Sequence, residues 1–260
     1  IKEYRYLENW TSVKQKLISG EFMQKVHEYD FAGIRVNPYK IKDDHLCSIV
    51  MQKIQHTAPS KWEQGRRNII SSFVSNRESF IEGLIRTTNR NPKRTGNKIQ
   101  TSLKFSRVKN YTDISYKVLF QSGAAVLRYG LNSEFAFDAD PLKIIELLER
   151  VFKETEDAAL HYKRYHPSFL AIRFTMPSKA YLSSSYNRPT AHLDMPTLNN
   201  TIGDQDLLEN YQLIMMQSGC IPHWGKVNNM LYMNPSFIQT AYPKFQTWID
   251  VRRQLDPNNT

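Results

Sequence analysis

The chain gathers several chemically useful side chains near its C-terminal end, in the run Ile221-Pro222-His223-Trp224-Gly225-Lys226. Within this run an imidazole, an indole and an ammonium surround a single glycine. Runs of this kind occur where a strand end packs a tryptophan, and they also occur in active sites. The run alone is therefore compatible with a structural role and with a functional one.

A second pair of polar residues lies on a predicted strand. His192 and Asp194 are two residues apart, so their side chains point to the same face and could reach one pocket. Their alternative role is that of ordinary hydrogen-bonded residues at a strand end. The two cysteines, Cys47 and Cys220, allow at most one disulfide and have no metal-ligand spacing, so no metal site is predicted.

The glycines of the sequence form no phosphate-binding loop. None of the ten belongs to a GxGxxG or P-loop arrangement. The GxSxG, HExxH and CxxC motifs are absent as well. We therefore expect the pyrophosphate of any nucleotide cofactor to be held mainly outside this chain.

Local sequence patterns predict the elements that must position these side chains. Hydrophobic spacing predicts helices at residues 9–19, 64–86, 204–217 and 243–255. Another helix begins with Asp140 as N-cap and Pro141 as first residue, and its apolar face is Leu142, Ile145, Leu148, Val151 and Phe152. Aromatic and β-branched residues predict strands at residues 29–36, 46–54, 114–120, 124–137, 168–175 and 188–195. Because strands and helices are clustered, the predicted fold class is α+β, with a largely antiparallel mixed sheet flanked by helices.

The 260 residues carry a formal net charge of +10, which favours acidic partners. Much of this excess lies between Arg86 and Lys109, a stretch without acidic residues. Its basic residues are Arg86, Arg90, Lys93, Arg94, Lys98, Lys104, Arg107 and Lys109. The turn signals Asn91-Pro92 and Gly96-Asn97 predict a mobile basic loop over residues 86–110. Such a loop is either simply solvated or docks on an anionic membrane surface or an acidic protein.

Other partners and locations are disfavoured. Nucleic-acid binding would need interleaved aromatic residues for stacking, and the basic stretch has Phe105 alone. No apolar run approaches the roughly 18 residues that span a bilayer, and no signal-like N-terminus is present. We therefore expect a cytoplasmic or peripheral membrane location. The chain begins at Ile1 rather than at a methionine, which suggests a fragment with an upstream part missing.

Two segments together resemble a known family. The run around His223 is followed by Tyr242-Pro243-Lys244-Phe245 and by a tail that ends at Asp256-Pro257. This combination resembles the C-terminal substrate region of the FAD-dependent aldonolactone oxidases, the gulonolactone, arabinonolactone and sugar-alcohol oxidases of the vanillyl-alcohol-oxidase superfamily. Upstream, Ala171-Ile172-Arg173, the loop from Leu182 to Tyr186, and Arg188 occur in the order of the family's strand-loop-strand segment. The resemblance covers residues 113–257, and flavin-dependent cholesterol oxidases share much of the same layout.

The resemblance implies a role for the whole chain. Residues 1–260 would form a single substrate-binding (cap) domain of a vanillyl-alcohol-oxidase-like flavoprotein, with the FAD-binding domain upstream and outside this chain. The enzyme would oxidise an alcohol carbon of a sugar lactone, a sugar alcohol or a sterol by hydride transfer to FAD. Such a reaction needs a proton acceptor near the hydroxyl and positive charge near the reduced flavin.

The resemblance also assigns roles to individual residues. Arg173 and Lys226 would be catalytic and supply positive charge, and His223 and Trp224 would lie with Lys226 at the cofactor. The expected substrate-binding residues are His192, Asp194, Glu134 and Arg188.

The sequence departs from the family at one position. Where the family has a glutamate two residues before the arginine, this chain has Ala171, and a methyl group cannot accept a proton. Either Glu134, Asp194 or His192 substitutes for the missing carboxylate, or the protein is a catalytically retired module that binds a ligand or an anionic surface.

Overall fold

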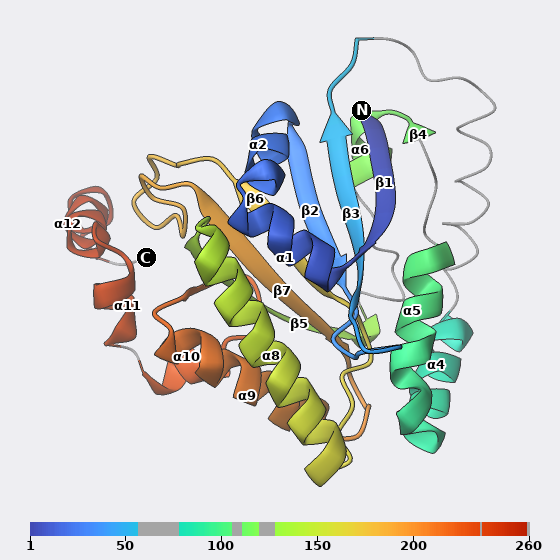
Figure 1. Ribbon diagram of the computed structural model, residues 1–260. Coiled ribbons are helices and arrows are strands. Elements are labelled where there is room, and N and C mark those ends of the chain that lie inside the picture. Colours follow the sequence, from blue (N-terminus) through green and yellow to red (C-terminus); the bar gives the residue numbers. More distant parts are fainter. Residues whose placement is uncertain (57–77, 106–110, 120–127, 235, 259–260) are drawn as a thin grey trace.

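The computed structural model describes residues 1–56, 78–105, 111–119, 128–234 and 236–258 (Figure 1). Within these residues eight strands form one sheet, in the order β4-β1-β3-β2-β6-β7-β5-β8. Every pair of neighbouring strands is antiparallel, which confirms the predicted α+β class with its antiparallel sheet. The strands are β1 (Lys2–Asn9), β2 (Phe31–Val36), β3 (Leu46–Lys53), β4 (Tyr111–Thr112), β5 (Gly130–Asp138), β6 (Leu170–Thr175), β7 (Thr190–Leu198) and β8 (Ile221–Pro222).

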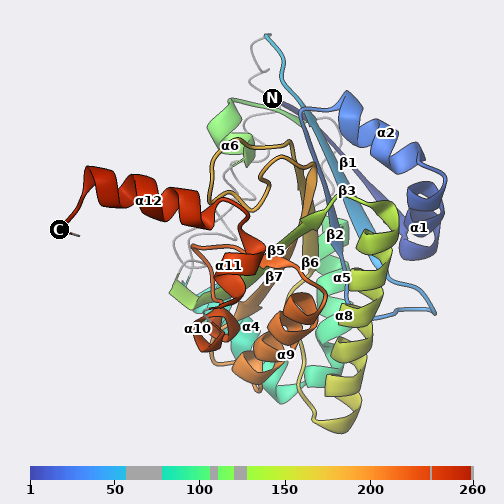
Figure 2. The ribbon, with the colours of Figure 1, turned by 90° about the vertical axis from the view of Figure 1, so that its left-hand side faces the viewer.

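Helices flank this sheet on both sides. They are α1 (Trp10–Ile18), α2 (Glu21–Glu28), α4 (Glu78–Arg90), α5 (Thr95–Phe105), α6 (Ser115–Leu119), α8 (Pro141–His161), α9 (Asp204–Gln217), α10 (Asn229–Met233), α11 (Phe237–Ala241) and α12 (Phe245–Leu255), with a 3-10 turn η1 (Pro92–Arg94). Figure 2 shows α12 projecting from the side of the sheet opposite to α1, α2 and α8.

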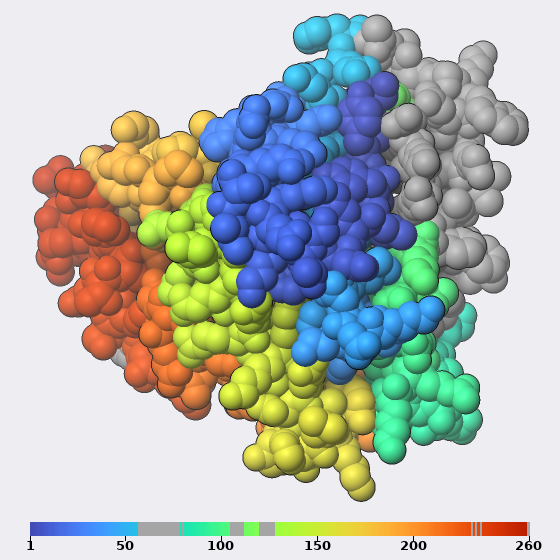
Figure 3. All heavy atoms as spheres, viewed as in Figure 1, coloured from blue at the N-terminus to red at the C-terminus, as the bar shows by residue number. Residues whose placement is uncertain are grey.

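Successive side chains of a strand point to opposite faces of the sheet, so the apolar residues that alternate with polar ones gather on one face. Ile34, Ile49, Phe135, Ile172 and Leu193 are buried on this face and form a core with α1, α2, α8 and α9. Helices α1, α2 and α8 cover the sheet in the space-filling view (Figure 3). Burying each such large side chain contributes roughly 1.5–3 kcal/mol, so this face holds the domain together.

The opposite face carries the polar residues of the same strands. At its β1–β3 end, Glu3 and Gln52 are buried, and Gln52 Nε2 donates to Glu3 Oε2 at 2.7 Å. At the far end of β7, α4 packs Ile81 and Ile85 against Leu198. Between these covered parts, the middle of β6, β7 and β5 leaves charged side chains partly exposed, and the candidate site lies there.

Helix α8 begins as the sequence predicts. The Asp140 side chain accepts a hydrogen bond from the backbone N–H of Lys143 at 2.9 Å, and Pro141 is the first helical residue. Its residues Ile145 and Leu148 are buried. Leu142 was predicted on the same apolar face, but its side chain is 66% exposed, because with 3.6 residues per turn it points away from the side of the helix that buries Ile144 and Leu148.

The prediction of a loop between Arg86 and Lys109 was wrong for the part that the structure describes. Residues 86–90 complete α4, η1 follows, and α5 continues to Phe105. The turn signals mark the junction between two helices. Ile99 and Leu103, one helical turn apart, are buried and anchor α5. Residues 106–110 lie outside the described residues.

A second local prediction was also wrong. Residues 114–120 were expected to form a strand, but Ser115–Leu119 is the helix α6. The Asp113 side chain accepts from the backbone N–H of Ile114 at 2.8 Å, and the N–H of Lys117 donates to Ile114 at 3.0 Å, so local hydrogen bonds close a helical turn. Residue 120 lies outside the described residues.

Several other predictions agree with the structure. The helix predicted at residues 204–217 is α9, and the helix predicted at 9–19 is α1. The helix predicted at 64–86 is confirmed from residue 78 onward, whereas residues 64–77 lie outside the described residues. Strand β1 and helix α2 were not predicted. Strand β1 nevertheless has the alternation of polar and aromatic residues that is typical of a half-buried strand, as in Glu3-Tyr4-Arg5-Tyr6.

Candidate functional site

Three neighbouring strands bring the predicted site residues together on the polar face of the sheet. Glu134 on β5 lies opposite Asp194 on β7, and Asp194 lies opposite Ala171 on β6. Arg173, two residues after Ala171, lies opposite His192. Adjacent strands are about 4.8 Å apart, so these side chains form one compact cluster.

Glu134 is the centre of this cluster. Its side chain is only 3% exposed, and three donors surround its carboxylate. Arg173 donates from its guanidinium, Lys226 Nζ lies 2.9 Å from Oε2, and His192 Nδ1 lies 3.0 Å from Oε1. Lys226 also contacts Asp194 Oδ1 at 2.6 Å. Two carboxylates therefore face two permanent cations, and the cluster is close to electrically neutral.

These contacts shift the pKa values of the cluster in different directions. Burial alone would raise the pKa of Glu134, but the hydrogen bond from His192 and the charges of Lys226 and Arg173 outweigh it and hold this pKa well below its usual range. Burial raises the pKa of Asp194 above its ordinary value, and Lys226 opposes this effect only in part. Glu134 is thus a fixed anion, whereas Asp194 is easier to protonate.

The two basic partners also have defined charge states. Burial alone would lower the pKa of Lys226, but Asp194 and Glu134 outweigh it and raise this pKa, so Lys226 is a stable cation. Burial lowers the pKa of His192, and the Glu134 contact offsets this only in part. The neutral imidazole is held at both nitrogens, because His192 Nε2 lies 3.0 Å from Thr175 Oγ1.

The run from Ile221 to Lys226 reaches this cluster through backbone pairing with β5. Phe135 pairs with Pro222 in β8, and the backbone N–H of His223 donates to the Glu134 carbonyl at 2.9 Å. Beyond the turn, the N–H of Val227 donates to the Asn132 carbonyl at 2.8 Å. The chain therefore leaves β5 and returns to it, and Lys226 lies at the return point beside Glu134.

Trp224, which the same turn carries, lines a separate apolar groove. Its ring is 45% exposed and stacks on Tyr242 with 5.0 Å between ring centroids. Its indole N–H donates to the Leu182 carbonyl at 3.1 Å. The groove has a volume of about 400 Å³ and is lined by Leu182, Trp224, Ile238, Phe245 and Trp248. The two C-terminal motifs of the sequence therefore meet in space, beside the charged cluster.

Arg188 is not brought to this cluster. It lies six residues before Asp194, which corresponds to roughly 20 Å along a strand. Its guanidinium donates to Asp138 Oδ1 at 2.7 Å and to the Ser184 carbonyl at 3.3 Å. These contacts fasten the loop before β7 to the end of β5.

Two residues that sequence reasoning missed adjoin the site. Thr175 contacts His192, and Arg35 on β2 lies opposite Ala171. Arg35 thus continues the row formed by Ala171, Asp194 and Glu134. The alternation of polar and apolar residues in β2 and β6 is the signal that could have placed both on this face. Gly33, beside Arg173, permits the close pairing of β2 and β6, because a β-carbon there would meet the Ile172 carbonyl oxygen at 2.8 Å.

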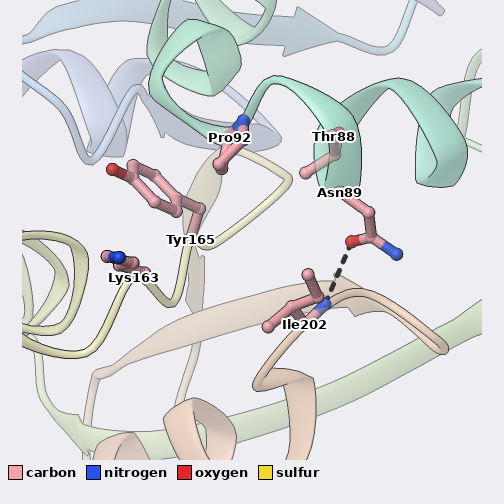
Figure 4. Close-up of a pocket in the computed structure, with 6 residues that line it drawn as sticks. All are labelled: Thr88, Asn89, Pro92, Lys163, Tyr165 and Ile202. Carbon is pink, nitrogen blue, oxygen red and sulfur yellow. Dashed lines mark hydrogen bonds between the residues drawn. The ribbon is translucent and has the colours of Figure 1, made fainter.

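A second, much smaller hollow has a structural role. It measures about 10 Å³ and is lined by Thr88, Asn89, Pro92, Lys163, Tyr165 and Ile202 (Figure 4). Asn89 accepts a hydrogen bond from the backbone N–H of Ile202 at 3.0 Å and donates to the Asn200 carbonyl at 2.9 Å. These bonds join α4 to the turn after β7, and the space holds no more than a water molecule.

The residues that the structure describes include no group of three or more His, Cys, Asp or Glu side chains arranged to bind a metal ion. Among the helices in the described part of the chain, none has the length and apolar character needed to cross a bilayer.

Comparisons with known proteins agree with this architecture. A solved structure described as a solvent-stable cholesterol oxidase superposes with a TM-score of 0.59 over 88% of this chain and 50% of that chain, at 13% sequence identity. The two proteins therefore share a fold over this part of the cholesterol oxidase chain. The family model for D-arabinono-1,4-lactone oxidase matches residues 6–260, and the chain belongs to this family.

A curated relative supports the same assignment. Mouse (Mus musculus) L-gulonolactone oxidase is 28% identical over 116 residues, which cover 40% of this chain and 26% of that protein. The chain thus spans about a quarter of this relative and half of the solved oxidase chain.

Proposed function

We propose that this chain is the substrate-binding part of an FAD-dependent oxidase that removes a hydride from an alcohol carbon of a sugar lactone. The cluster around Glu134 is the observation that carries this proposal. It holds two cations and a second carboxylate at a partly exposed surface of the sheet. The family match and the mouse relative favour a sugar lactone over a sugar alcohol, whereas the likeness to a cholesterol oxidase concerns the fold alone.

The residues at this surface fit a flavin. The Arg173 side chain is 46% exposed although it pairs with Glu134, so part of its guanidinium can face a cofactor. Lys226 is 23% exposed and stays charged. His223 and Trp224 lie on the same turn as Lys226. These four residues would contact the flavin ring, while a domain outside this chain would hold most of the FAD, since the sequence has no glycine-rich phosphate loop.

The remaining residues of the cluster orient the charges. When bound, FAD accepts the hydride, and positive charge beside the reduced ring stabilises it. Glu134 anchors Arg173, Lys226 and His192 in fixed positions, and Thr175 sets the orientation of His192. Because these groups are already held in place, no reorganisation is needed during the reaction.

The proposal is tested on the full-length protein loaded with FAD. The protein is mixed anaerobically with an aldonolactone, a sugar alcohol or cholesterol, and the loss of the visible absorbance of the oxidised flavin is followed. We expect the aldonolactone to bleach the flavin most rapidly. A flavin that stays oxidised with every one of these alcohols would contradict the proposal.

Ala171 favours a second candidate, a retired family member that binds a ligand or an anionic surface. Arg86, Arg90, Lys93 and Arg94 are exposed at the junction of α4 and α5 and could contact anionic lipid headgroups. In this case the loaded flavin would stay oxidised with all three alcohols, and the protein would bind anionic vesicles but not neutral ones.

A further inference from the structure

The strand register shows what stands beside the small side chain of Ala171. Across β6 and β7, Ala171 lies directly opposite Asp194, and on its other side it lies opposite Arg35. Paired residues on antiparallel strands have β-carbons about 5 Å apart. The carboxylate of Asp194 therefore lies directly beside the position that carries a methyl group in place of the family's glutamate.

The two carboxylates of the cluster differ in their exposure and in the number of ion-pair partners that surround them. Glu134 is 3% exposed and is surrounded by Arg173, His192 and Lys226. Asp194 is 23% exposed, and its ion pair among the described residues is with Lys226. The ammonium group of Lys226 contacts both carboxylates. Asp194 is thus the carboxylate that a substrate can approach and that can change its protonation state.

His192 does not compete for this role. Its side chain is 5% exposed, and its two ring nitrogens contact Glu134 at 3.0 Å and Thr175 at 3.0 Å. A proton from a substrate hydroxyl would need a free nitrogen at the surface.

We propose that Asp194 accepts the hydroxyl proton of the alcohol substrate and that Glu134 is a positioning residue for the cations around it. This inference rests on the proposed function. The C–H bond of the substrate breaks and its electron pair leaves as hydride to the flavin. The O–H bond breaks, its proton passes to the Asp194 carboxylate, and the C=O double bond forms.

The charged surroundings of Asp194 favour this assignment. Burial raises its pKa, and the charge of Glu134 from β5 adds to this effect, whereas Lys226 after β8 and a hydrogen bond from Asn132 oppose it. Arg35 from β2 lies beyond Ala171 in the same row. Two carboxylates whose environments separate their pKa values take different roles in a site, one as a fixed charge and one as an acid-base group.

The first test compares flavin reduction in the full-length, FAD-loaded protein and its Asp194→Asn variant. We expect the limiting rate to fall about 100- to 10,000-fold with little change in substrate KM, and the rise of the rate with pH to disappear. Asp206→Asn, the same change at a 54%-exposed position on α9, is the matched control and should leave the rate unchanged. An Asp194→Asn variant that keeps the wild-type rate and pH profile would overturn the inference.

A second variant tests the geometry and guards against a simple folding defect. Because residues 171 and 194 lie side by side, the double variant Ala171→Glu/Asp194→Asn returns a carboxylate to the neighbouring position on the same face. We expect it to recover part of the lost rate. A double variant as slow as Asp194→Asn, with native circular dichroism, would contradict the placement of the proton acceptor at this point of the sheet.

A readout without turnover completes the test. Carboxyl 13C resonances of aspartate are followed against pH, and the resonance that Asp194→Asn removes should titrate above the ordinary value of about 3.9. Titration at or below that value would overturn the inference. If the wild-type flavin is not reduced by any alcohol, the proposed function fails and this inference with it. Reduction that is equally fast in Asp194→Asn would overturn the inference alone.

Discussion

Glu134→Gln is expected to destabilise the protein at neutral pH, whereas Asp194→Asn is not. The two residues are paired directly across β5 and β7, so the same chemical change is made at matched backbone positions. Their surroundings differ. Glu134 is 3% exposed and receives contacts from Arg173, His192 and Lys226, while Asp194 is 23% exposed and pairs with Lys226.

The magnitude follows from what each change leaves behind. Removing one member of a buried ion pair costs about 3–5 kcal/mol. Two partners of Glu134 reduce this cost. The Arg173 side chain is 46% exposed and can be solvated by water, and Lys226 retains its ion pair with Asp194. We therefore expect Glu134→Gln to cost about 2–3 kcal/mol, chiefly from the buried His192 and the lost charge. Asp194→Asn should change stability by about 0–1 kcal/mol, in the stabilising direction.

The dependence on pH has opposite signs at the two positions. Folding lowers the pKa of Glu134, so its stabilisation is present above the unfolded value of about 4.3 and is lost as the pH falls below it. Folding raises the pKa of Asp194, so the penalty of its charge grows as the pH rises above about 3.9 and vanishes below it. The differences of both variants from wild type should therefore shrink as the pH is lowered from 6 towards about 3.

Thermal unfolding of the full-length protein, followed by circular dichroism at several pH values, measures these effects. A change of 1 kcal/mol shifts Tm by about 2–4 °C in domains of this size, so Glu134→Gln should lower Tm by about 4–12 °C at neutral pH. Equal destabilisation by the two variants would refute the distinction between the carboxylates. A Glu134→Gln variant as stable as wild type would refute the role of Glu134 as the anchor of the cluster.

Two further predictions concern a pair of arginines and a pair of glycines. Arg173→Ala should slow flavin reduction about 100- to 1,000-fold, since it removes a charge at the proposed flavin surface, whereas Arg188→Ala should not change the rate, because Arg188 fastens a distant loop. Gly203→Ala should lower Tm more than Gly219→Ala. Both glycines have positive φ, +77° at Gly203 and +72° at Gly219, and this conformation costs an alanine roughly 1–2 kcal/mol. A β-carbon at 203 would in addition meet Arg164 Cγ at 2.4 Å, whereas a β-carbon at 219 would have no atom within 4 Å. Equal losses in either pair would contradict these assignments.

The sequence predicts elements best where local chemistry and packing agree. Helix α8 has both an N-cap at Asp140 and a regular apolar spacing, and it begins where these signals place it. The stretch after Arg86 has turn signals at Asn91-Pro92 and Gly96-Asn97, yet α5 forms because Ile99 and Leu103 find a buried surface. That surface comes from other parts of the chain, and no local pattern describes it.

At the candidate site, too, some features follow from local sequence and others from contacts between distant residues. Spacing by two residues places His192 and Asp194 on one face, and the family resemblance names Arg173 and Lys226. Neither shows that Glu134 stands between them, since that follows from the register of β5 against β7. Arg188 occupies a suitable place in the sequence, but the strand carries it away from the cluster.

Sequence patterns alone indicated the α+β class, the family resemblance and the charged residues that gather on one face of the sheet. They also identified Ala171 as the position where the expected carboxylate is missing. The pairing of the strands sets which carboxylate lies beside that position and which is held among cations. A side chain's charge and conformational freedom depend on its neighbours across strands, and in this sheet residues 134, 171, 194 and 226 meet only through long-range pairing.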